Sequence, residues 1–313
     1  GAKKLTNVIP LVEGGVRKRP GTFFTDTMAN AVRLIPFVVS SDKSYMLILK
    51  PYVMDIYDPR SKNVVATVST PYTANQIPII QFVQYRYEMF FTHNDVPVQR
   101  FRCSPDFTNW EFSPFVFTNA PTDSENARSP FRKGKPSGKD VGAFVSFTLD
   151  AINSWVSTTA YLTGDVIQYS GKTYQATQDN NNKQPDISAS YWVEVTAGSG
   201  GFSASDVGKY IEVNGGIIRI TQYVATNVIN GEILKKLDDD VQAIERSWTI
   251  LPLAFNSDDG YPRCCTYFKQ RLVLANTKKA PNKIWFSAVG GNANFLETTD
   301  DGDAFSVVSA SGL

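Results

Sequence analysis

A repeated pattern of short apolar runs and turns restricts the fold of this chain more than any other feature. Counted from Pro36 and from Pro78, a tyrosine at the ninth position is followed by a mostly apolar run, and the two prolines are 42 residues apart. A third copy begins at Pro262. Each copy predicts a strand, a turn, a buried strand, another turn and a strand. This period is typical of a β-propeller blade, with three unrelated β-meanders as the alternative.

A sheet of this size does not bury both of its faces by itself. We therefore expect the three units to be adjacent in space, although residues 120–250 separate the second from the third. For the same reason we expect Leu47, Phe90 and Val273 to share a core.

The composition supports a mainly β protein, because aromatic residues (20 Phe, 14 Tyr, 5 Trp) and turn formers (21 Gly, 17 Pro) are both frequent. With 313 residues, of which 42% are hydrophobic, the chain is long enough for one large globular domain or for two to three small ones. The formal net charge of +1 argues against a dedicated nucleic-acid binder and against a protein held to membranes by charge. The longest apolar runs, 35–39 and 77–80, predict no membrane-spanning segment.

The chain contains few of the histidine and cysteine side chains that commonly act in catalysis. His93 is the single histidine, so a zinc site with two histidine ligands is excluded, and a Ser-His-Asp or Cys-His site would have to use this residue. Its setting predicts a turn histidine with local hydrogen bonds. Three cysteines, Cys103, Cys264 and Cys265, form no disulfide framework and favour synthesis in a reducing compartment. We predict no enzymatic activity and no cofactor.

The fold class that these patterns predict is mainly β, with partial propeller-like blades, an inserted β-rich platform domain and a small β module. The predicted parts are an arm (1–34), two blade-like units (35–119), the platform (120–152 and 196–250), the module (153–195) and the start of a third unit (251–313). A basic stretch, 120–140, reads as a solvated loop rather than a phosphate-binding patch. The best helix candidate is 237–246, where three aspartates stand near the N-terminus.

Several short motifs follow one another in a fixed order. The first is Arg17-Lys18-Arg19-Pro20-Gly21-Thr22, followed by the segments 55–58, 91–97, 108–110 and 202–208. The last block comprises 260–263, 268–272, Pro281, Ile284-Trp285, Ser287, Asn294-Phe295 and 300–304. Together they resemble the tail nozzle proteins of podophages, the tail tubular protein B family, over nearly the whole chain outside 153–195. Members of that family are usually longer, so the chain looks like their N-terminal part or an unusually short relative.

This resemblance implies a structural component of a short viral tail, made in the host cytoplasm and located in the virion. The family forms a homo-oligomeric ring, typically a hexamer, below the tail adaptor protein, and DNA leaves through it without sequence recognition. Tail fibres are a further implied partner. Arg17, Lys18 and Arg19 could then face DNA in the channel or anchor a neighbouring subunit, and the sequence does not separate these two roles.

Residues 153–195 carry a second pattern of aromatic and turn residues at fixed spacing: Trp155, Tyr161, Gly164, Asp165, Val166, Tyr169, Gly171, Tyr174, Ala176 and Trp192. It resembles the chitin-binding type of carbohydrate-binding module. The spacing predicts a small β module with its own core, built on Tyr161, Val166, Tyr169, Tyr174 and Trp192. A unit of this size is marginally stable alone without disulfides, so we expect it to lean on the platform.

Trp155 and Tyr161 are the candidate sugar-binding residues, and an adhesin that contacts the host surface through this module is the alternative function. Sugar-binding members carry exposed aromatic residues where this chain has 177–182, which contains none. The sequence therefore argues against binding of host polysaccharide. An envelope-degrading enzyme has only an ample supply of carboxylates in its favour.

One acidic turn remains as a weak metal candidate. Asp300, Asp301 and Asp303 could offer oxygen ligands to calcium, but the turn lacks the later acidic residue of a calcium-binding loop. A solvated turn or a subunit contact is the stronger interpretation, so we predict no metal site.

Overall fold

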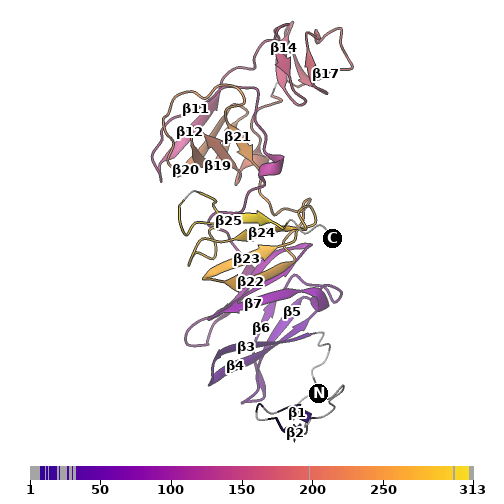
Figure 1. Cartoon of the computed structure of the whole chain (residues 1–313), viewed down its shortest axis with the longest axis vertical. Helices are drawn as coiled ribbons and strands as arrows, with labels where there is room; N and C mark the ends of the chain where they lie inside the picture. Colours follow the sequence, from indigo (N-terminus) through magenta and orange to yellow (C-terminus); the bar gives the residue numbers. More distant parts are fainter. Residues whose placement is uncertain are drawn as a thin grey trace.

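The computed structural model describes residues 8–10, 12, 14–19, 21, 27, 30, 33–196, 198–298 and 300–309. The chain is mainly β, as predicted, and helical geometry in these residues is confined to three short 3-10 turns, Ile77–Ile79, Ser124–Asn126 and Ala204–Asp206. Antiparallel sheets follow one another along the long axis (Figure 1). Within the described residues, no helix has both the length and the apolar character needed to span a bilayer.

Two four-stranded sheets form the lower part of the molecule in Figure 1. The first sheet consists of β3 (Arg33–Ser40), β4 (Lys43–Lys50), β5 (Val53–Asp58) and β6 (Asn63–Ser69). The second sheet consists of β7 (Gln81–Tyr85), β8 (Glu88–His93), β9 (Val96–Cys103) and β10 (Trp110–Pro114). Each is a simple meander in which consecutive strands pair.

The first and second sheets enclose one shared apolar core. Phe37 of the first sheet meets Phe101 of the second edge to face, with ring centroids 5.1 Å apart. Leu47 and Met89, which stand at the same position after their prolines, both lie in this core. The equivalent faces of the first and second sheets therefore pack on one another. In a propeller, rotation about a central axis carries each blade onto the next, so neighbouring blades present opposite faces to each other. In this respect the first two units are related as the halves of a sandwich.

The third sheet packs against the other face of the second sheet, so these two units are adjacent despite their separation in sequence. It consists of β22 (Cys264–Phe268), β23 (Arg271–Ala275), β24 (Lys283–Phe286) and β25 (Phe305–Val308). Phe90 shares a core with Leu272 and Leu274. The Thr92 hydroxyl donates to the carbonyl of Arg263 at 3.0 Å.

Leu47, Phe90 and Val273 do not share one core, contrary to expectation. Successive residues of a strand point to opposite faces, so Phe90 faces the third sheet while its neighbours Met89 and Phe91 face the first. Val273 lies between Leu272 and Leu274, on the face of the third sheet that is turned away from Phe90.

Between the second and third sheets the chain forms a six-stranded, curled half-barrel, in the region predicted as the platform. Its strands are β11 (Gly134–Pro136), β12 (Phe144–Leu149), β18 (Tyr210–Val213), β19 (Gly216–Ala225), β20 (Val228–Lys235) and β21 (Thr249–Leu251). Phe147 and Trp248 lie in its core with ring centroids 4.9 Å apart. Gly134 is required beside them, because an added Cβ would lie 2.3 Å from Phe147 Cζ.

Two local predictions in this region are wrong. The basic stretch is no simple solvated loop, since Arg132 is buried and its Nε donates to the carbonyl of Asp150 at 3.1 Å. Residues 237–246 form no helix. Instead, Ala243 exchanges two backbone hydrogen bonds with Gly134, at 2.8 and 3.1 Å, and the Asn214 side chain donates to the carbonyl of Val241. These long-range bonds use the backbone groups that a helix would pair internally.

The module has its own core, at the upper end of the molecule in Figure 1. It contains β13 (Ala160–Tyr161), β14 (Val166–Tyr169), β15 (Lys172–Ala176), β16 (Asn180–Asn181) and β17 (Trp192–Val195). Tyr161, Tyr174 and Trp192 occupy the core, with Tyr169 packed at its edge, as predicted. Ile167 takes the place expected for Val166, whose side chain instead lies against Gly200.

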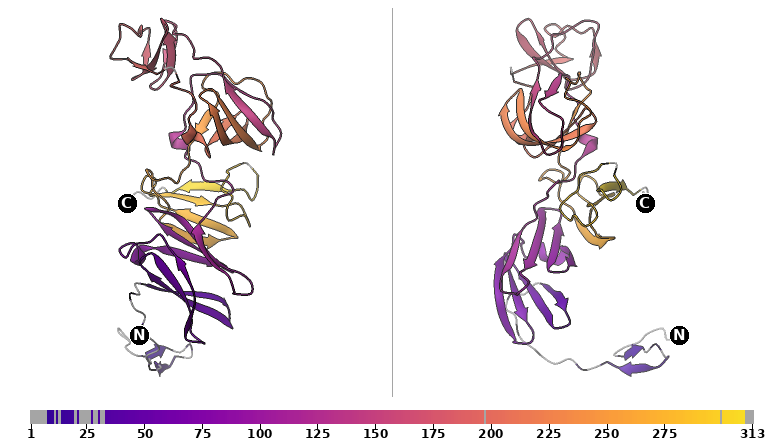
Figure 2. Two further views of the ribbon diagram at one scale, coloured as in Figure 1. Left: turned by 180° about the vertical axis from the view of Figure 1, so that it is seen from behind. Right: turned by 90° about the vertical axis from the view of Figure 1, so that its left-hand side faces the viewer.

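At the opposite end, a hairpin pairs β1 (Val8–Pro10) with β2 (Val16–Lys18). It stands off from the stacked sheets (Figure 2). Its residues Ile9, Val12 and Val16 are exposed.

We expect the two faces of β8 to make the second sheet the most sensitive part of the stack. Phe90→Ala removes a fully buried ring that meets Phe115 edge to face at 5.1 Å, and it should lower the free energy of unfolding by about 3–5 kcal/mol. Phe144→Ala is the matched control, because that ring is 74% exposed. Urea titration followed by tryptophan fluorescence measures both, and equal midpoints for the two variants would contradict the stacked arrangement.

Candidate functional site

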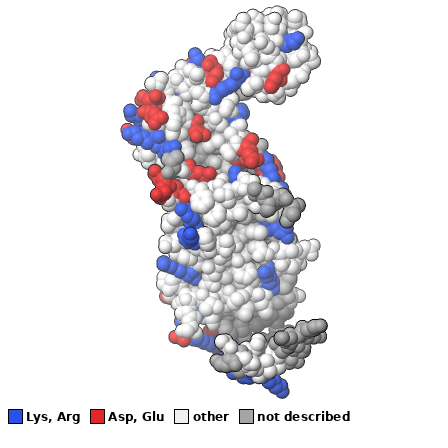
Figure 3. Space-filling view, in the orientation of Figure 1, with Lys and Arg blue, Asp and Glu red and all other residues white. Residues whose placement is uncertain are grey.

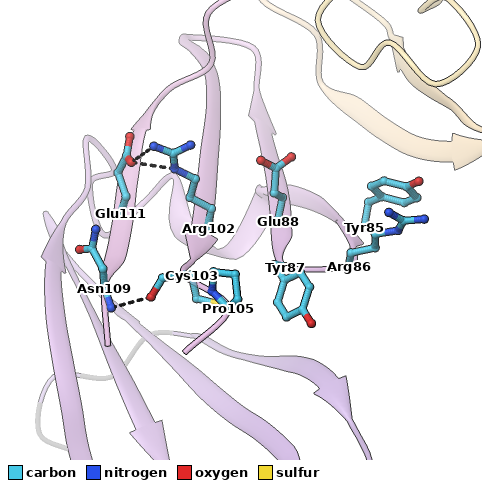
Figure 4. A pocket seen from close by; sticks show the side chains of 10 residues that line it. Tyr85, Arg86, Tyr87, Glu88, Arg102, Cys103, Pro105, Asn109 and Glu111 are labelled. Atoms are coloured by element: carbon cyan, nitrogen blue, oxygen red, sulfur yellow. Dashed lines mark hydrogen bonds and ion pairs between the residues drawn. The ribbon is translucent and has the colours of Figure 1, made fainter. Parts of the chain in front are cut away.

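A cavity of about 450 Å³ opens at one end of the second sheet, where the β7–β8 and β9–β10 turns come together (Figure 4). Short polar turns place these side chains there, because both hairpins end at the same edge of the sheet. The lining residues are Tyr85, Arg86, Tyr87, Glu88, Arg102, Cys103, Ser104, Pro105, Asn109 and Glu111.

The charged groups of this cavity are largely paired with one another. Arg102 approaches Glu111 at 2.6 and 2.8 Å, and the Ser113 hydroxyl donates to the same carboxylate at 2.8 Å. The Ser113 hydroxyl and then Arg102 hold the pKa of Glu111 below its usual range. Glu88 lies 3.7 Å from Arg100. The Glu111 carboxylate is therefore not poised to exchange a proton near neutral pH.

The remaining groups do not form an activated nucleophile. Burial raises the pKa of the Cys103 thiol to about 11, so it is protonated at neutral pH. Tyr85 stacks on Tyr267 with centroids 4.2 Å apart, and Arg86 lies over the Tyr85 ring at 5.2 Å. The cavity therefore offers hydrogen-bonding groups to a polar ligand, while Tyr85 is already engaged by its neighbours.

A second cavity, of about 350 Å³, lies where the module meets the platform. Arg246 of the platform forms an ion pair with Asp165 of the module and lies 4.6 Å from the centroid of the Phe131 ring. Phe131 in turn packs edge to face on Tyr161, at 5.6 Å. The module thus leans on the platform, as expected. The sequence marked Asp165 only as a turn residue and gave no sign of Arg246, which is 81 positions away.

The structure removes Tyr161 from the sugar-binding candidates. Its ring is 1% exposed, and its hydroxyl donates to the carbonyl of Val156 and accepts from the Val156 amide. A ring enclosed in this way cannot stack on a sugar. Trp155 is half-buried and packs edge to face on Tyr169, at 5.6 Å.

The acidic turn gathers no metal site. Asp303 accepts a hydrogen bond from the Thr298 hydroxyl, and its carbonyl accepts one from Arg271 at 2.6 Å. No group of three or more His, Cys, Asp or Glu side chains suited to a metal ion occurs in the described part of the chain. Asp300 and Asp301 are exposed.

The basic residues of the arm lie on the hairpin: Arg17 and Lys18 belong to β2, and Arg19 follows it. All three are exposed. Pro20 and Thr22 of the same motif lie outside the described residues.

His93 is a turn histidine with local hydrogen bonds, as predicted. It ends β8, is 4% exposed, and its Nδ1 accepts a hydrogen bond from the amide of Asp95 at 3.1 Å. Burial lowers the pKa of His93, and the nearby Arg263 and Lys278 lower it further, against the opposing effect of Asp95.

No protein-family model matches this chain, and no curated protein is detectably similar to it in sequence.

The lowered pKa of His93 makes stability depend on pH. The unfolded chain binds a proton near pH 6.5 and the folded chain only at lower pH, so this contribution to stability is complete above pH 6.5 and is lost as pH falls toward the folded pKa. The free energy of unfolding should fall between pH 7.5 and 5.5, with a slope of at most about 1.4 kcal/mol per pH unit. Because His93 is the single histidine, His93→Asn should flatten the urea midpoint across this range, and an unchanged slope would refute the assignment.

The Arg246–Asp165 pair should hold the module in place. Arg246→Ala leaves a 6% exposed carboxylate without its cation and should weaken the contact by about 1.5–3 kcal/mol. Limited proteolysis should then cut the segment 196–201 faster. Lys172→Ala, which removes an exposed ion pair within the module, is the control. Equal cleavage rates would show that Arg246 does not restrain the module.

Proposed function

We propose that the chain is a structural subunit of a podophage tail nozzle, a homo-oligomeric ring below the tail adaptor protein through which DNA is ejected. Its partners would be further copies of itself, most simply in a hexamer, together with the adaptor and the tail fibres. Its location would be the virion tail, and its role would be mechanical rather than catalytic.

The observation that carries the proposal is the meeting of motifs that lie far apart in the sequence. The amide of Tyr261 donates to the carbonyl of Asn94 at 2.9 Å, which joins the motif at 260–263 to the motif at 91–97. Lys278 reinforces this joint by pairing with Asp95 at 2.5 Å. These residues fasten the third sheet to the second, so the resemblance rests on residues that maintain the architecture.

Other parts of the same motif set also have structural roles. Trp110 packs on Phe37 and Phe101 in the first core. Asp206 accepts from the Ser203 amide at 2.8 Å and closes the 3-10 turn that leads into β18. Motifs that build a scaffold rather than a reaction centre are what a tail component requires.

The distribution of charge is compatible with passage of DNA without sequence recognition. On the face in Figure 3, acidic side chains gather over the upper half, and the column of stacked sheets below carries few charges, most of them basic. Grooves that read bases are lined by convergent Arg, Lys, Asn and Gln. In the two cavities described above, Arg102 is paired with Glu111 and Asp165 with Arg246 instead.

The adhesin alternative loses support from the burial of Tyr161, and no described feature of the module favours it over the nozzle.

The purified chain should associate into closed rings. Light scattering coupled to size exclusion measures the mass, and negative-stain electron microscopy distinguishes rings from open chains. A polysaccharide pull-down and a reducing-sugar assay on the same preparation test the adhesin and the enzyme. A chain that stays monomeric at every concentration, or that turns over envelope polymer, would overturn the proposal.

A further inference from the structure

The N-terminal hairpin has features of an arm that needs a partner. Its strands are only three residues long, and an isolated two-stranded hairpin is marginally stable in water. Ile9 is 38% exposed, Val16 58% and Val12 fully exposed. In the described parts of the chain, no ion pair includes Arg17, Lys18 or Arg19. The hairpin therefore exposes apolar and basic side chains together.

A complementary surface lies at the edge of the third sheet. β25 pairs with β24 on one side and ends the sheet on the other. Phe305 is 41% exposed, Val307 42% and Val308 62%. A strand edge without charged or proline residues is a template on which another strand can pair.

The outer face beside β25 is also apolar. Phe305 stacks on Phe286 of β24 with centroids 4.4 Å apart, and Val307, two positions further along β25, is 42% exposed. An incoming hairpin could therefore bury apolar side chains as well as form backbone hydrogen bonds.

The turn that leads into β25 carries the opposite charge to the hairpin. Asp300 and Asp301 are exposed, and neither takes part in an ion pair within the residues that the structure describes. Arg17 lies in β2, and Arg19 follows that strand directly. The two surfaces thus match in charge, apolar character and unpaired strand edges.

We propose that the N-terminal hairpin of one copy docks along β25 and the acidic turn of a second copy. The partner is another molecule, because the first and second sheets lie between the hairpin and β25 of the same chain (Figures 1 and 2). A head-to-tail contact of this kind closes into a ring or continues as an open chain. The inference rests on the proposed function in that it names the contact that would build the ring.

A charge-swap experiment tests the contact. One variant carries Arg17→Glu with Arg19→Glu, a second carries Asp300→Lys with Asp301→Lys, and a third combines all four. The control, Lys135→Glu with Lys139→Glu, changes the net charge by the same amount as the arginine swap, but at exposed positions of the platform. Association is measured by analytical ultracentrifugation over a concentration series, particle shape by electron microscopy, and folding by circular dichroism.

Each two-site swap should raise the concentration for half-maximal association roughly tenfold, because attraction becomes repulsion at exposed charges. The four-site variant should regain most of the association, and the control should match the unmodified chain. Added salt should weaken the association of the unmodified chain and of the control to the same extent, because both keep the opposite charges at the proposed contact.

The outcomes separate the inference from the proposed function. Rings that persist in both two-site variants would overturn the inference and leave the nozzle proposal standing. Open chains that respond to the swaps would support the inference and contradict the ring. A monomer at every concentration would overturn both. If the Arg17 and Arg19 variant instead loses binding to a short DNA duplex, measured by fluorescence anisotropy, while assembly is unchanged, the hairpin contacts DNA and the inference is wrong.

Discussion

The burial of β8 on both faces is the constraint on which the lower half of the molecule depends. Met89 and Phe91 complete the core shared with the first sheet, and Phe90 completes the core shared with the third. Burial of side chains of this size contributes about 1.5–3 kcal/mol each. A strand buried on both sides has no alternation of polar and apolar residues, which is why its sequence reads as an unbroken apolar run. Its last two residues are polar. The Thr92 hydroxyl donates to a carbonyl beside the third sheet, and His93 Nδ1 accepts a hydrogen bond within its own turn.

The half-barrel and the module lie between the second and third sheets in the sequence. They are compatible with the stacking of these sheets because the two ends of the intervening segment are joined by hydrogen bonds. The amide of Ala254 donates to the carbonyl of Pro121 at 2.9 Å, and the amide of Asp123 donates to the carbonyl of Pro252 at the same distance. Chain leaving the second sheet therefore lies beside chain entering the third. A domain inserted between two such neighbouring points adds only a slowly growing loop-closure cost. The half-barrel and the module could thus be acquired without rearranging the sheets below them.

The predictions that the structure confirms concern features determined by residues close together in the sequence. The alternation along the strands, the turn geometry at His93 and the aromatic spacing of the module all depend on neighbours within a few residues. The failures are long-range. Residues 237–246 have helical propensity, yet Ala243 pairs with Gly134 across the half-barrel. The pairing of equivalent faces in the first two sheets, and the partnership of Arg246 with Asp165, depend on how separate units dock. The periodicity of a single strand does not predict which face of a sheet packs on which neighbour. The second sheet, for example, is buried on both faces.

Some side chains are paired or packed within the chain, and others are exposed at its surface. In the two cavities described above, Glu111 pairs with Arg102 and Asp165 with Arg246, and in the module Tyr161 and Trp192 are packed into the core. Exposed apolar side chains occur at many positions of the described residues, and the hairpin and the edge strand β25 are among them. An exposed hairpin and an exposed strand edge at two distant points of an elongated chain are compatible with the head-to-tail contact proposed above.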